Sequence, residues 1–550
     1  MIRPGKVKWI YKLILPVLGL LLQLMLTAAC AGQTAEPAGT TGSAVTTAAA
    51  TSAAAAETTA GPNLAARPAA ASGVLRLWWS ARQNLNPLLE VSQSGLAINS
   101  LIYDGLFEID AGGQAQLKLA ERMTVSADGL KVQIRLCGGL AFHDGQPVQA
   151  ADAAACLEFI LASAGSSAYT GELAAIAAAE TPDSLTLELT LSHPDPWLAW
   201  ALTFPVIPAS RLDAGPFDLV AGTGDFQMQS YDAAEGLSLV KVRPCGELSE
   251  LLTIRVREYD SLSAAMQGFA DDEIDLIGLS ADDYYRYELR GNLRFEPYLS
   301  RQLLILAFNT KIRQPLADSG RLLFLKQLLN SDSLQAAGAG IWGECTPVNL
   351  PLSSYLLDGQ SAGVQSVLDS LGQPDWDESS RELVFLMPEN DFFRLSIAEL
   401  LGNCLTEAGV PWRMEILADP EYQLAIGQGE YDLTILEAVL PNDPDPTWLY
   451  RADRPMAYNA LSVLDGSGLA DYELWRERLI QASNPNRADP AVGGYPSLLR
   501  ETAARSPWNV LMIRSAAILY GSRVIGQCRP DCYNPYQGIE ELWIWSGQSS

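Results

Sequence analysis

Residues 119–152 carry the pattern that most restricts what this chain can fold into. Val132, Ile134 and Leu136 alternate with polar side chains, which predicts a strand that buries one of its two faces. Asp-Gly and Gly-Gly pairs, which favour turns, flank this strand at 128–129, 138–139 and 144–145. We therefore expect a half-buried strand enclosed by tight turns.

The N-terminus has the three parts of an export signal. Four basic residues lie within the first twelve, residues 13–26 are apolar, and small residues precede Cys30. The apolar run ends at this cysteine as in bacterial lipoprotein precursors, which predicts a signal peptide over 1–29 and a lipid anchor on Cys30. Thr27 replaces the usual leucine, so ordinary secretion with a free thiol, or an uncleaved anchor, is the alternative. No second apolar run reaches the roughly 18 residues that a membrane span needs.

Residues 30–72 differ sharply in composition from the rest of the chain. After the cysteine they consist mostly of Ala, Thr, Gly and Ser, with very few large apolar side chains. Such a segment buries too little surface to offset its ordering entropy, so we expect a disordered tether. The chain beyond it is long enough for two or three domains.

The formal net charge of −27 excludes one class of partner. A strongly acidic surface repels phosphate backbones, so nucleic-acid binding is not expected. The same charge is compatible with cationic ligands, although net charge is more often a solubility feature than a property of a binding pocket.

The cysteines divide into a helical position and a turn. Cys404 lies on an apolar stripe at helical spacing within 397–408, which predicts a small buried hydrophobe. Cys528 and Cys532 flank a proline turn, where both a short-loop disulfide and two free thiols remain open. A structural zinc site needs four ligands, and no other Cys or His lies nearby in sequence, so no metal site is expected.

The chain has only two histidines, His143 and His193, and these decide whether several classes of enzyme are possible. Residues 359–363 match the Gly-x-Ser-x-Gly pattern, but an α/β-hydrolase needs a histidine after that serine and none follows His193. Zinc-protease, P-loop and dinucleotide-binding motifs are absent from the sequence, and we expect neither a cofactor nor catalysis. A surface glycosidase, which needs only two opposed carboxylates, is the enzyme class left open.

Ordered motifs resemble those of the family 5 extracellular solute-binding proteins, the oligopeptide, dipeptide and nickel receptors of ABC importers. The most specific is the block of Leu-Ala-Glu, Ser-x-Asp-Gly, strand and Phe-His-Asp-Gly-x-Pro within 119–152. Further matches stand, in family order, at 86–88, 102–107, 222–224, 273–275, 429–432 and 524–535. Asp225 replaces a proline of the family pattern, and Asp272 replaces a glycine.

This resemblance implies an α/β, two-lobed periplasmic-binding-protein-like fold of type II, in the large peptide-binder variety with an inserted subdomain. The first lobe would comprise residues 73–112, 206–305 and 501–550. The inserted subdomain would cover 113–205 and the second lobe 306–500. Within that second lobe the sequence itself predicts a strand, a helix and a strand, at 383–387, 397–408 and 431–436.

The resemblance also suggests where a ligand would bind. In peptide-binding members, a Trp and an Asp ahead of an acidic-Pro pair hold the α-amino group of the peptide. Anchored on residues 445–446 of this chain, the Asp position holds Asn442 and the Trp position holds Val439. Asp443, one residue further along, and Trp448 are additional candidates. A solvated turn is the alternative reading of this Asp- and Pro-rich segment.

A second candidate segment is the loop over 92–96, which faces the ligand in family members. Ser94 and Gly95 are its candidate ligand-binding residues, because a loop of this kind offers backbone groups to an extended ligand. His143, within the Phe-His-Asp-Gly turn, is expected to have a structural role.

These observations predict a monomeric, lipid-anchored receptor that captures peptides or another small solute between its lobes and delivers them to an ABC permease and ATPase complex. Its expected location is the extracellular face of the bacterial cytoplasmic membrane, or the periplasm. A ligand sensor or chaperone-like surface protein with the same fold is the alternative. Nickel is a less favoured ligand, because two histidines and no evident ligand cluster offer little to a transition metal.

Overall fold

The computed structural model describes residues 71–80, 84–163, 166–242, 253–288, 293–310, 319–330, 381–442 and 506–545, with short pieces at 316, 333–334 and 345–347. All of the described residues belong to one compact unit, Pro68–Ser550. No helix among them is long and apolar enough to span a membrane.

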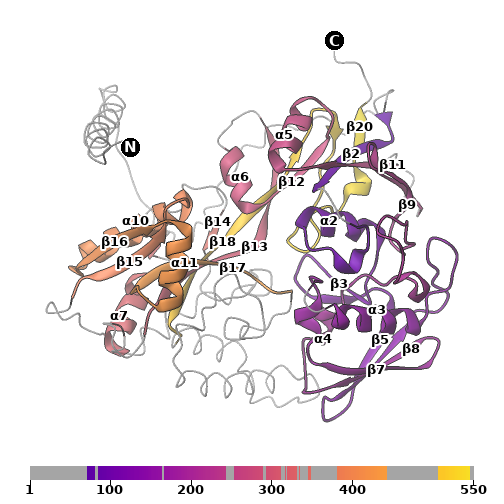
Figure 1. Ribbon diagram of the computed structural model, residues 1–550, viewed down its shortest axis with the longest axis horizontal. Helices are drawn as coiled ribbons and strands as arrows, with labels where there is room; N and C mark the ends of the chain where they lie inside the picture. Colours follow the sequence, from indigo (N-terminus) through magenta and orange to yellow (C-terminus); the bar gives the residue numbers. More distant parts are fainter. Residues whose placement is uncertain are drawn as a thin grey trace, which may run out of the picture. The chain divides into compact units, whose positions relative to one another are not determined.

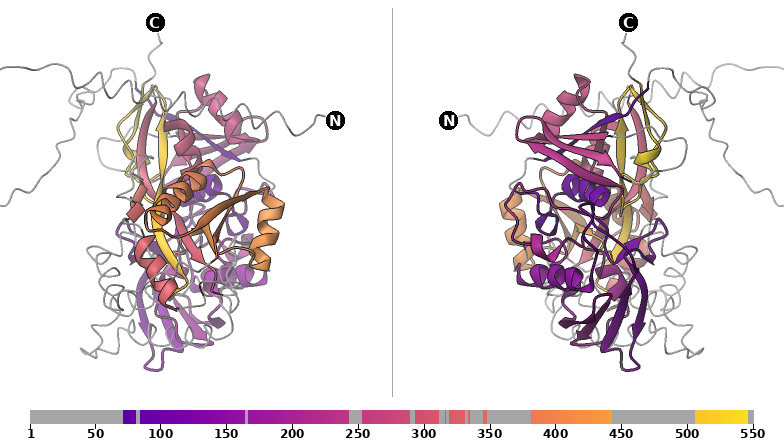
Figure 2. Two further views of the ribbon diagram at one scale, coloured as in Figure 1. Left: turned by 90° about the vertical axis from the view of Figure 1, so that its left-hand side faces the viewer. Right: turned by 90° about the vertical axis from the view of Figure 1, so that its right-hand side faces the viewer.

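The predicted strand is confirmed as β6 (Lys131–Leu136), whose residues alternate between exposed and buried. It is a central strand of an antiparallel sheet in the order β5-β6-β8-β7, with β5 (Ala120–Val125), β7 (Ile176–Asp183) and β8 (Thr186–Leu191). Helix α3 (Ala150–Ala162) packs on this sheet, as the purple elements of Figure 2 show. The inward side chains of the strands and of α3 therefore share one core.

A second sheet has the order β2-β11-β10-β9. Its strands are β2 (Val74–Ser80), β9 (Phe226–Asp232), β10 (Gly236–Lys241) and β11 (Thr253–Tyr259). β2 and β11 are parallel although about 180 positions separate them in sequence. Helix α2 (Gln93–Ile102) packs on β2 and β9, which joins this sheet to the same large core.

The third sheet has seven strands in the order β12-β18-β13-β17-β15-β16, with β14 paired to β18. The strands are β12 (Leu276–Leu279), β13 (Arg294–Phe308), β14 (Cys345–Pro347), β15 (Leu383–Pro388), β16 (Trp412–Leu417), β17 (Leu433–Val439) and β18 (Trp508–Tyr520). Figure 1 shows β13 and β18 running side by side through this sheet. The expected boundary at residue 305 falls inside β13.

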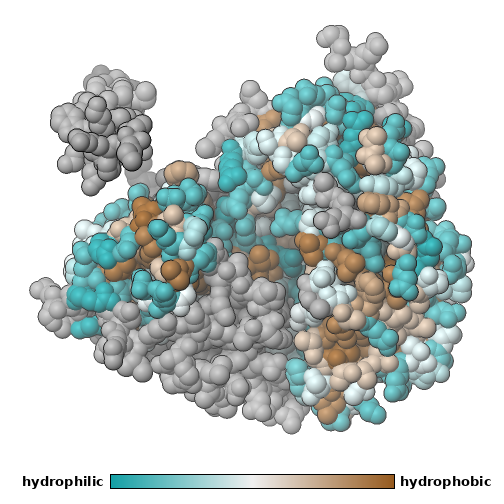
Figure 3. Space-filling view, in the orientation of Figure 1, coloured by the Kyte–Doolittle hydropathy of each residue, from teal (hydrophilic) through white to brown (hydrophobic). Residues whose placement is uncertain are grey.

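The predicted strand, helix and strand of the 383–436 region correspond to β15, α10 (Phe392–Glu407) and β17. The helix begins earlier than its apolar stripe indicates, at the Asp391 cap, whose side chain accepts a hydrogen bond from the backbone N–H of Arg394. β16 and α11 (Asp419–Gln428) lie between α10 and β17 and were not identified from the sequence. Over α10 and α11 the surface carries apolar side chains (Figure 3), including Phe392 and Leu424.

β13 and β18 each contribute to more than one hydrophobic core. Leu304 and Leu511 pack in the core beneath α10 and β15. Ile518 belongs to the large core shared by the first two sheets, whereas Leu519 belongs to a smaller core with β12 and helices α5 (Leu262–Ala270) and α6 (Ala281–Glu288). The two strands therefore leave one core and enter others along their length.

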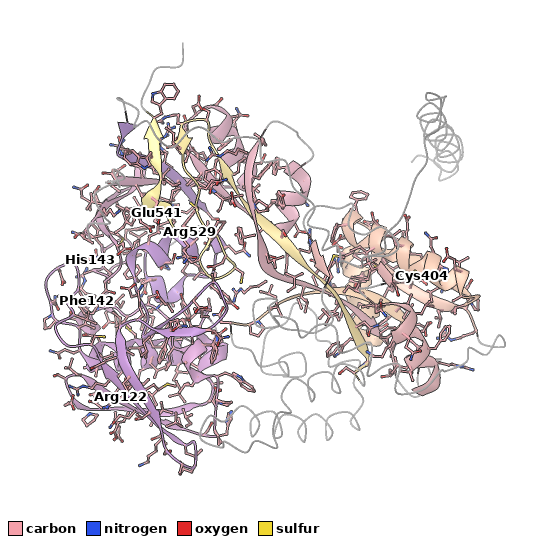
Figure 4. The ribbon with its side chains drawn as sticks, turned by 180° about the vertical axis from the view of Figure 1, so that it is seen from behind. Arg122, Phe142, His143, Cys404, Arg529 and Glu541 are labelled. Atoms are coloured by element: carbon pink, nitrogen blue, oxygen red, sulfur yellow. The ribbon has the colours of Figure 1, made fainter. Side chains whose placement is uncertain are left out.

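His143 holds the Gly-Thr-Gly crossover at 222–224 in place. Its Nδ1 accepts a hydrogen bond from the backbone N–H of Gly222 at 3.3 Å, and its Nε2 bonds to the carbonyl of Gly224 at 2.9 Å. Its backbone N–H donates to the carbonyl of Gly222 at 2.9 Å. Figure 4 shows His143 beside Phe142. These bonds use both ring nitrogens, as a neutral imidazole with its proton on Nε2 requires, and they agree with a structural role.

The strands β12 and β17 are each preceded by an aspartate that makes the same kinds of hydrogen bond. Asp275 precedes β12 and accepts hydrogen bonds from the backbone N–H and the guanidinium of Arg76. Asp432 precedes β17 and accepts from the backbone N–H of Val384 and from the guanidinium of Arg381. Each carboxylate thus joins the start of one strand to a neighbouring segment and is neutralised by an arginine. A left-handed residue follows the helix before each strand, Asp272 (φ 56°) ahead of β12 and Gly429 (φ 71°) ahead of β17.

We predict that Gly222→Ala destabilises the protein by about 1–3 kcal/mol, at the upper end of that range. A Cβ at this position would lie 2.0 Å from the carbonyl oxygen of Ile102 and 2.7 Å from the Tyr103 ring. Urea unfolding followed by circular dichroism measures the change. Gly138→Ala is the matched control, because nothing lies within 4 Å of a Cβ there. A Gly222→Ala protein as stable as Gly138→Ala would contradict this steric explanation.

Asp272→Gly is expected to raise the free energy of unfolding by up to about 1 kcal/mol, because glycine occupies the left-handed region without a Cβ penalty. Asp272→Asn is the matched control, since it removes the same charge near Arg76 but keeps the Cβ. Thermal and urea unfolding of both variants give the comparison. The prediction fails if the glycine variant is no more stable than the asparagine variant.

Candidate functional site

The strands β13, β17 and β18 meet at an irregularity. The pairing of β13 with β18 shifts between Leu299 and Leu303, so that residues 300–302 stand opposite the single residue Arg514. The hydroxyl of Ser300 donates to the carbonyl of Arg514 at 2.6 Å and fills the gap in the ladder. Such a bulge bends a strand and redirects its side chains. It also lies between the parts of β13 and β18 that belong to different cores.

Asn442, the candidate taken from the amine-binding position, lies three residues after β17 and contacts two charged side chains. The guanidinium of Arg301, in the bulge, donates to its Oδ1. Its Nδ2 donates to one carboxylate oxygen of Glu172 at 3.3 Å, and its backbone N–H donates to the other at 3.4 Å. Burial raises the pKa of the adjacent Tyr169, and the charge of Glu172 raises it further.

This arrangement explains why an amide suits position 442. An asparagine accepts from Arg301 with its oxygen and donates to Glu172 with its nitrogen, so both neighbours are satisfied. An aspartate would keep the first bond, lose the second, and place two carboxylates against each other. Glu172 comes from the 3-10 helix η2 (Thr170–Leu173), some 270 positions earlier in the chain, and its proximity has no local sequence signal.

The other candidates near the start of the chain, Ser94 and Gly95, lie in the first turn of α2 and not in a loop, because the Ser92 side chain caps the helix there. The hydroxyl of Ser94 accepts from the backbone N–H of Ser80 at 3.1 Å and bonds to the Ser80 hydroxyl at 3.2 Å. The backbone N–H of Gly95 donates to the side chain of Ser92, which caps α2. A Cβ on Gly95 would lie 2.2 Å from the carboxylate of Glu90, so glycine is required for this close approach. Their role in ligand binding stays a prediction.

Four sequence-based sites, Cys30, Asp443, Trp448 and the motif at 359–363, lie outside the described residues. Among the described residues, no group of three or more His, Cys, Asp or Glu is placed to hold a metal ion.

Five cysteines are free thiols: Cys137, Cys156, Cys404, Cys528 and Cys532. For Cys528 and Cys532 this is the second of the two states left open by the sequence. Burial raises the pKa of both thiols to about 12, so neither is a reactive thiolate near neutral pH. Cys404 lies on α10 (Figure 4) and is half-buried, not fully buried as its apolar stripe indicates. His193 lies in a loop, where its Nδ1 bonds to the hydroxyl of Ser192.

Comparisons with known proteins agree with the sequence motifs. Residues 114–456 match the model of the bacterial extracellular solute-binding proteins, family 5. A Brucella ovis protein, named for peptide binding by an ABC transporter, is 22% identical over 524 residues, which cover 88% of this chain and 96% of that protein.

Solved structures show the same fold. An ABC transporter substrate-binding protein from Listeria monocytogenes is similar with a TM-score of 0.64 and 19% identity, covering 86% of this chain and all of that one, 100%. A periplasmic murein tripeptide-binding protein, in its unliganded open form, also has a TM-score of 0.64, with 16% identity, covering 87% of this chain and 99% of that one.

We predict that Asn442→Asp and Glu172→Gln are energetically coupled. The aspartate should be less favourable beside Glu172 than beside glutamine, because two carboxylates would lie where an amide now donates to one. A double-mutant cycle from urea unfolding should give a coupling of about 1 kcal/mol, and it should shrink in high salt. Additive effects of the two substitutions would show that Asn442 and Glu172 do not interact in solution.

Proposed function

Because the chain belongs to the family 5 bacterial extracellular solute-binding proteins, we propose that it is the lipid-anchored receptor of an ABC importer and captures oligopeptides. Its fold is of the type II, peptide-binder kind, as expected from the sequence. The general role in ABC transport follows from the family. The lipid anchor on Cys30, the oligopeptide ligand, the monomeric state and the position outside the cytoplasmic membrane are parts of the proposal.

The family match over residues 114–456 is the observation that carries this function. Support for a peptide ligand comes from the Brucella ovis relative, whose name gives peptides as its ligand. The export signal and Cys30 support a lipid anchor. No step of this function needs a bond in the ligand to be made or broken, so we propose no catalytic residue.

Capture requires that binding changes the protein in a way that a permease can detect. A ligand that contacts two lobes favours the arrangement in which they are close together. In this chain β13 and β18 pass between separate cores and carry an irregularity where they do so. We propose that bending occurs there, between Leu299 and Leu303.

The ligand's amino group would face a different environment from that of family members with an aspartate at the matching position. Asn442 carries no charge, but Glu172 lies against it and supplies a carboxylate from the inserted segment. Asn442, Asp443, Trp448, Ser94 and Gly95 remain the proposed ligand-binding residues.

Protein purified from its own host should retain a peptide that native mass spectrometry detects as an added mass, released unchanged on denaturation. Titration calorimetry with the identified peptide and its N-acetylated form would follow. We expect weaker binding of the acetylated form, because acetylation removes the charge that a carboxylate at this site attracts. A recovered ligand that is not a peptide would contradict the oligopeptide proposal, and cleaved compounds would contradict the receptor role.

A ligand sensor that keeps this fold without transport is the second candidate. The uncharged Asn442 at the matching position favours it, since a receptor adapted to another task need not retain the aspartate. Deletion of the gene distinguishes the two candidates, because loss of uptake of the identified ligand is expected only for the importer subunit.

A further inference from the structure

Arg514 stands opposite the bulge in β13 and its guanidinium lies among acidic and aromatic side chains. Its side chain is only 3% exposed. Its Nη1 bonds to a carboxylate oxygen of Asp282 at 2.5 Å and to one of Glu437 at 2.8 Å. The guanidinium carbon lies 4.4 Å from the centre of the Phe393 ring, within the range of a cation–π contact.

The partners of Arg514 come from elements that pack in different cores. Asp282 is in the first turn of α6, and Tyr284 of the same helix belongs to the core with β12 and α5. Phe393 is the second residue of α10 and belongs to the core with β15. Glu437 is on β17, whose Leu433 and Ile435 also lie in that second core. One arginine at the irregularity therefore joins the two cores by ion pairs.

We propose that the ion pairs of Arg514 with Asp282 and Glu437, here called the clasp, stabilise the present arrangement of the two cores. The bond between Arg514 and Asp282 is the one that breaks when β13 and β18 bend. This proposal rests on the hinge-bending receptor function proposed above. It concerns the protein's own conformational equilibrium and requires no ligand.

The ion pairs of Arg514 with Asp282 and with Glu437 differ in the free energy needed to break them. The side chain of Asp282 is 47% exposed and that of Glu437 is 21% exposed. A carboxylate that is already half in water is hydrated readily once its partner leaves, and such pairs contribute little stability. A more buried carboxylate that loses its partner retains an uncompensated charge.

Further contacts hold Arg514 close to Glu437 on β17 and to the start of α10. Burial raises the pKa of Glu437, while the charges of Arg394 and Arg514 oppose the rise. Arg394 is itself fixed by Asp391 and by the carbonyl of Ile435, two residues before Glu437 on β17. The Phe393 ring holds the guanidinium on the same side. When β13 and β18 bend, Arg514 should therefore move together with β17 and α10, and its ion pair with Asp282 should break.

The clasp has a functional consequence. A contact made in only one conformation shifts the equilibrium toward that conformation. Loss of the Asp282 bond should lower the population of the present arrangement relative to others by about 1.5-fold to fivefold, the range expected for one partly exposed ion pair. Ligands that select this arrangement would then bind more weakly by at most the same factor.

Distance measurements on the ligand-free full-length protein test this inference. Spin labels on unnatural amino acids at Ser263, on α5, and at the exposed Asn403, on α10, report the separation of the two cores by electron paramagnetic resonance. Asp282→Ala should shift the distance distribution away from the wild-type maximum. Asp260→Ala, at an exposed aspartate just before α5, is the matched control and should leave it unchanged.

Asp282→Asn provides a second variant that keeps the size of the side chain and removes its charge, and it should give a smaller shift in the same direction. Glu437→Gln should instead lower the urea midpoint of unfolding, since it weakens the less exposed pair. Distributions of Asp282→Ala and Asp282→Asn that coincide with wild type would overturn the proposal. A shift in these variants without any detectable uptake function would overturn only the transport role.

Discussion

The antiparallel pairing of β13 with β18 is the constraint on which the rest of the third sheet depends. β13 has 15 residues and β18 has 13, and all residues of β18 are buried. Backbone groups that are buried in this way must be paired, so neither strand can leave the other without exposing unsatisfied donors and acceptors. Yet their side chains enter different cores along their length. The bulge allows both, because β13 and β18 stay paired across it while their side chains pass from one core to another. There the Ser300 hydroxyl makes a hydrogen bond in place of a missing backbone bond.

The same local arrangement of helix, turn and strand occurs in the cores on either side of this strand pair. A helix is followed by a left-handed residue and then a strand, and an aspartate at the start of that strand accepts from a neighbouring backbone N–H and from an arginine. Asp275 and Asp432 have side chains only 2% and 0% exposed, and their buried charges are compensated by Arg76 with Arg523 at Asp275 and by Arg381 at Asp432. Asp272 shows that the left-handed position tolerates a residue other than glycine, at a cost in backbone strain.

Elements that leave a periodic pattern in the sequence could be predicted, whereas contacts that only the fold creates could not. β6 was predictable because one face is exposed and the other buried, which leaves a period of two in the chain. α10 was predictable from its apolar stripe, although its true start depends on the Asp391 cap. β18 is buried on both faces and has no such period, so its bulge partner Arg514 gives no signal. Likewise, the residue matching an amine-binding aspartate was found by resemblance, but its neighbour Glu172 was not, because only the fold brings them together.

The bulge also places two arginines of a very acidic chain at one point. Arg301 stands within it and reaches Asn442, beside Glu172, while Arg514 stands opposite and reaches Asp282 and Glu437. With a net charge of −27, carboxylates that converge on a shared strand pair would repel each other without cations between them. Each arginine offers several donors in a fixed plane, so it can serve acceptors from two elements at once. The irregularity in β13 thus does more than bend the strand, because it brings cations to the place where acidic groups from different cores approach one another.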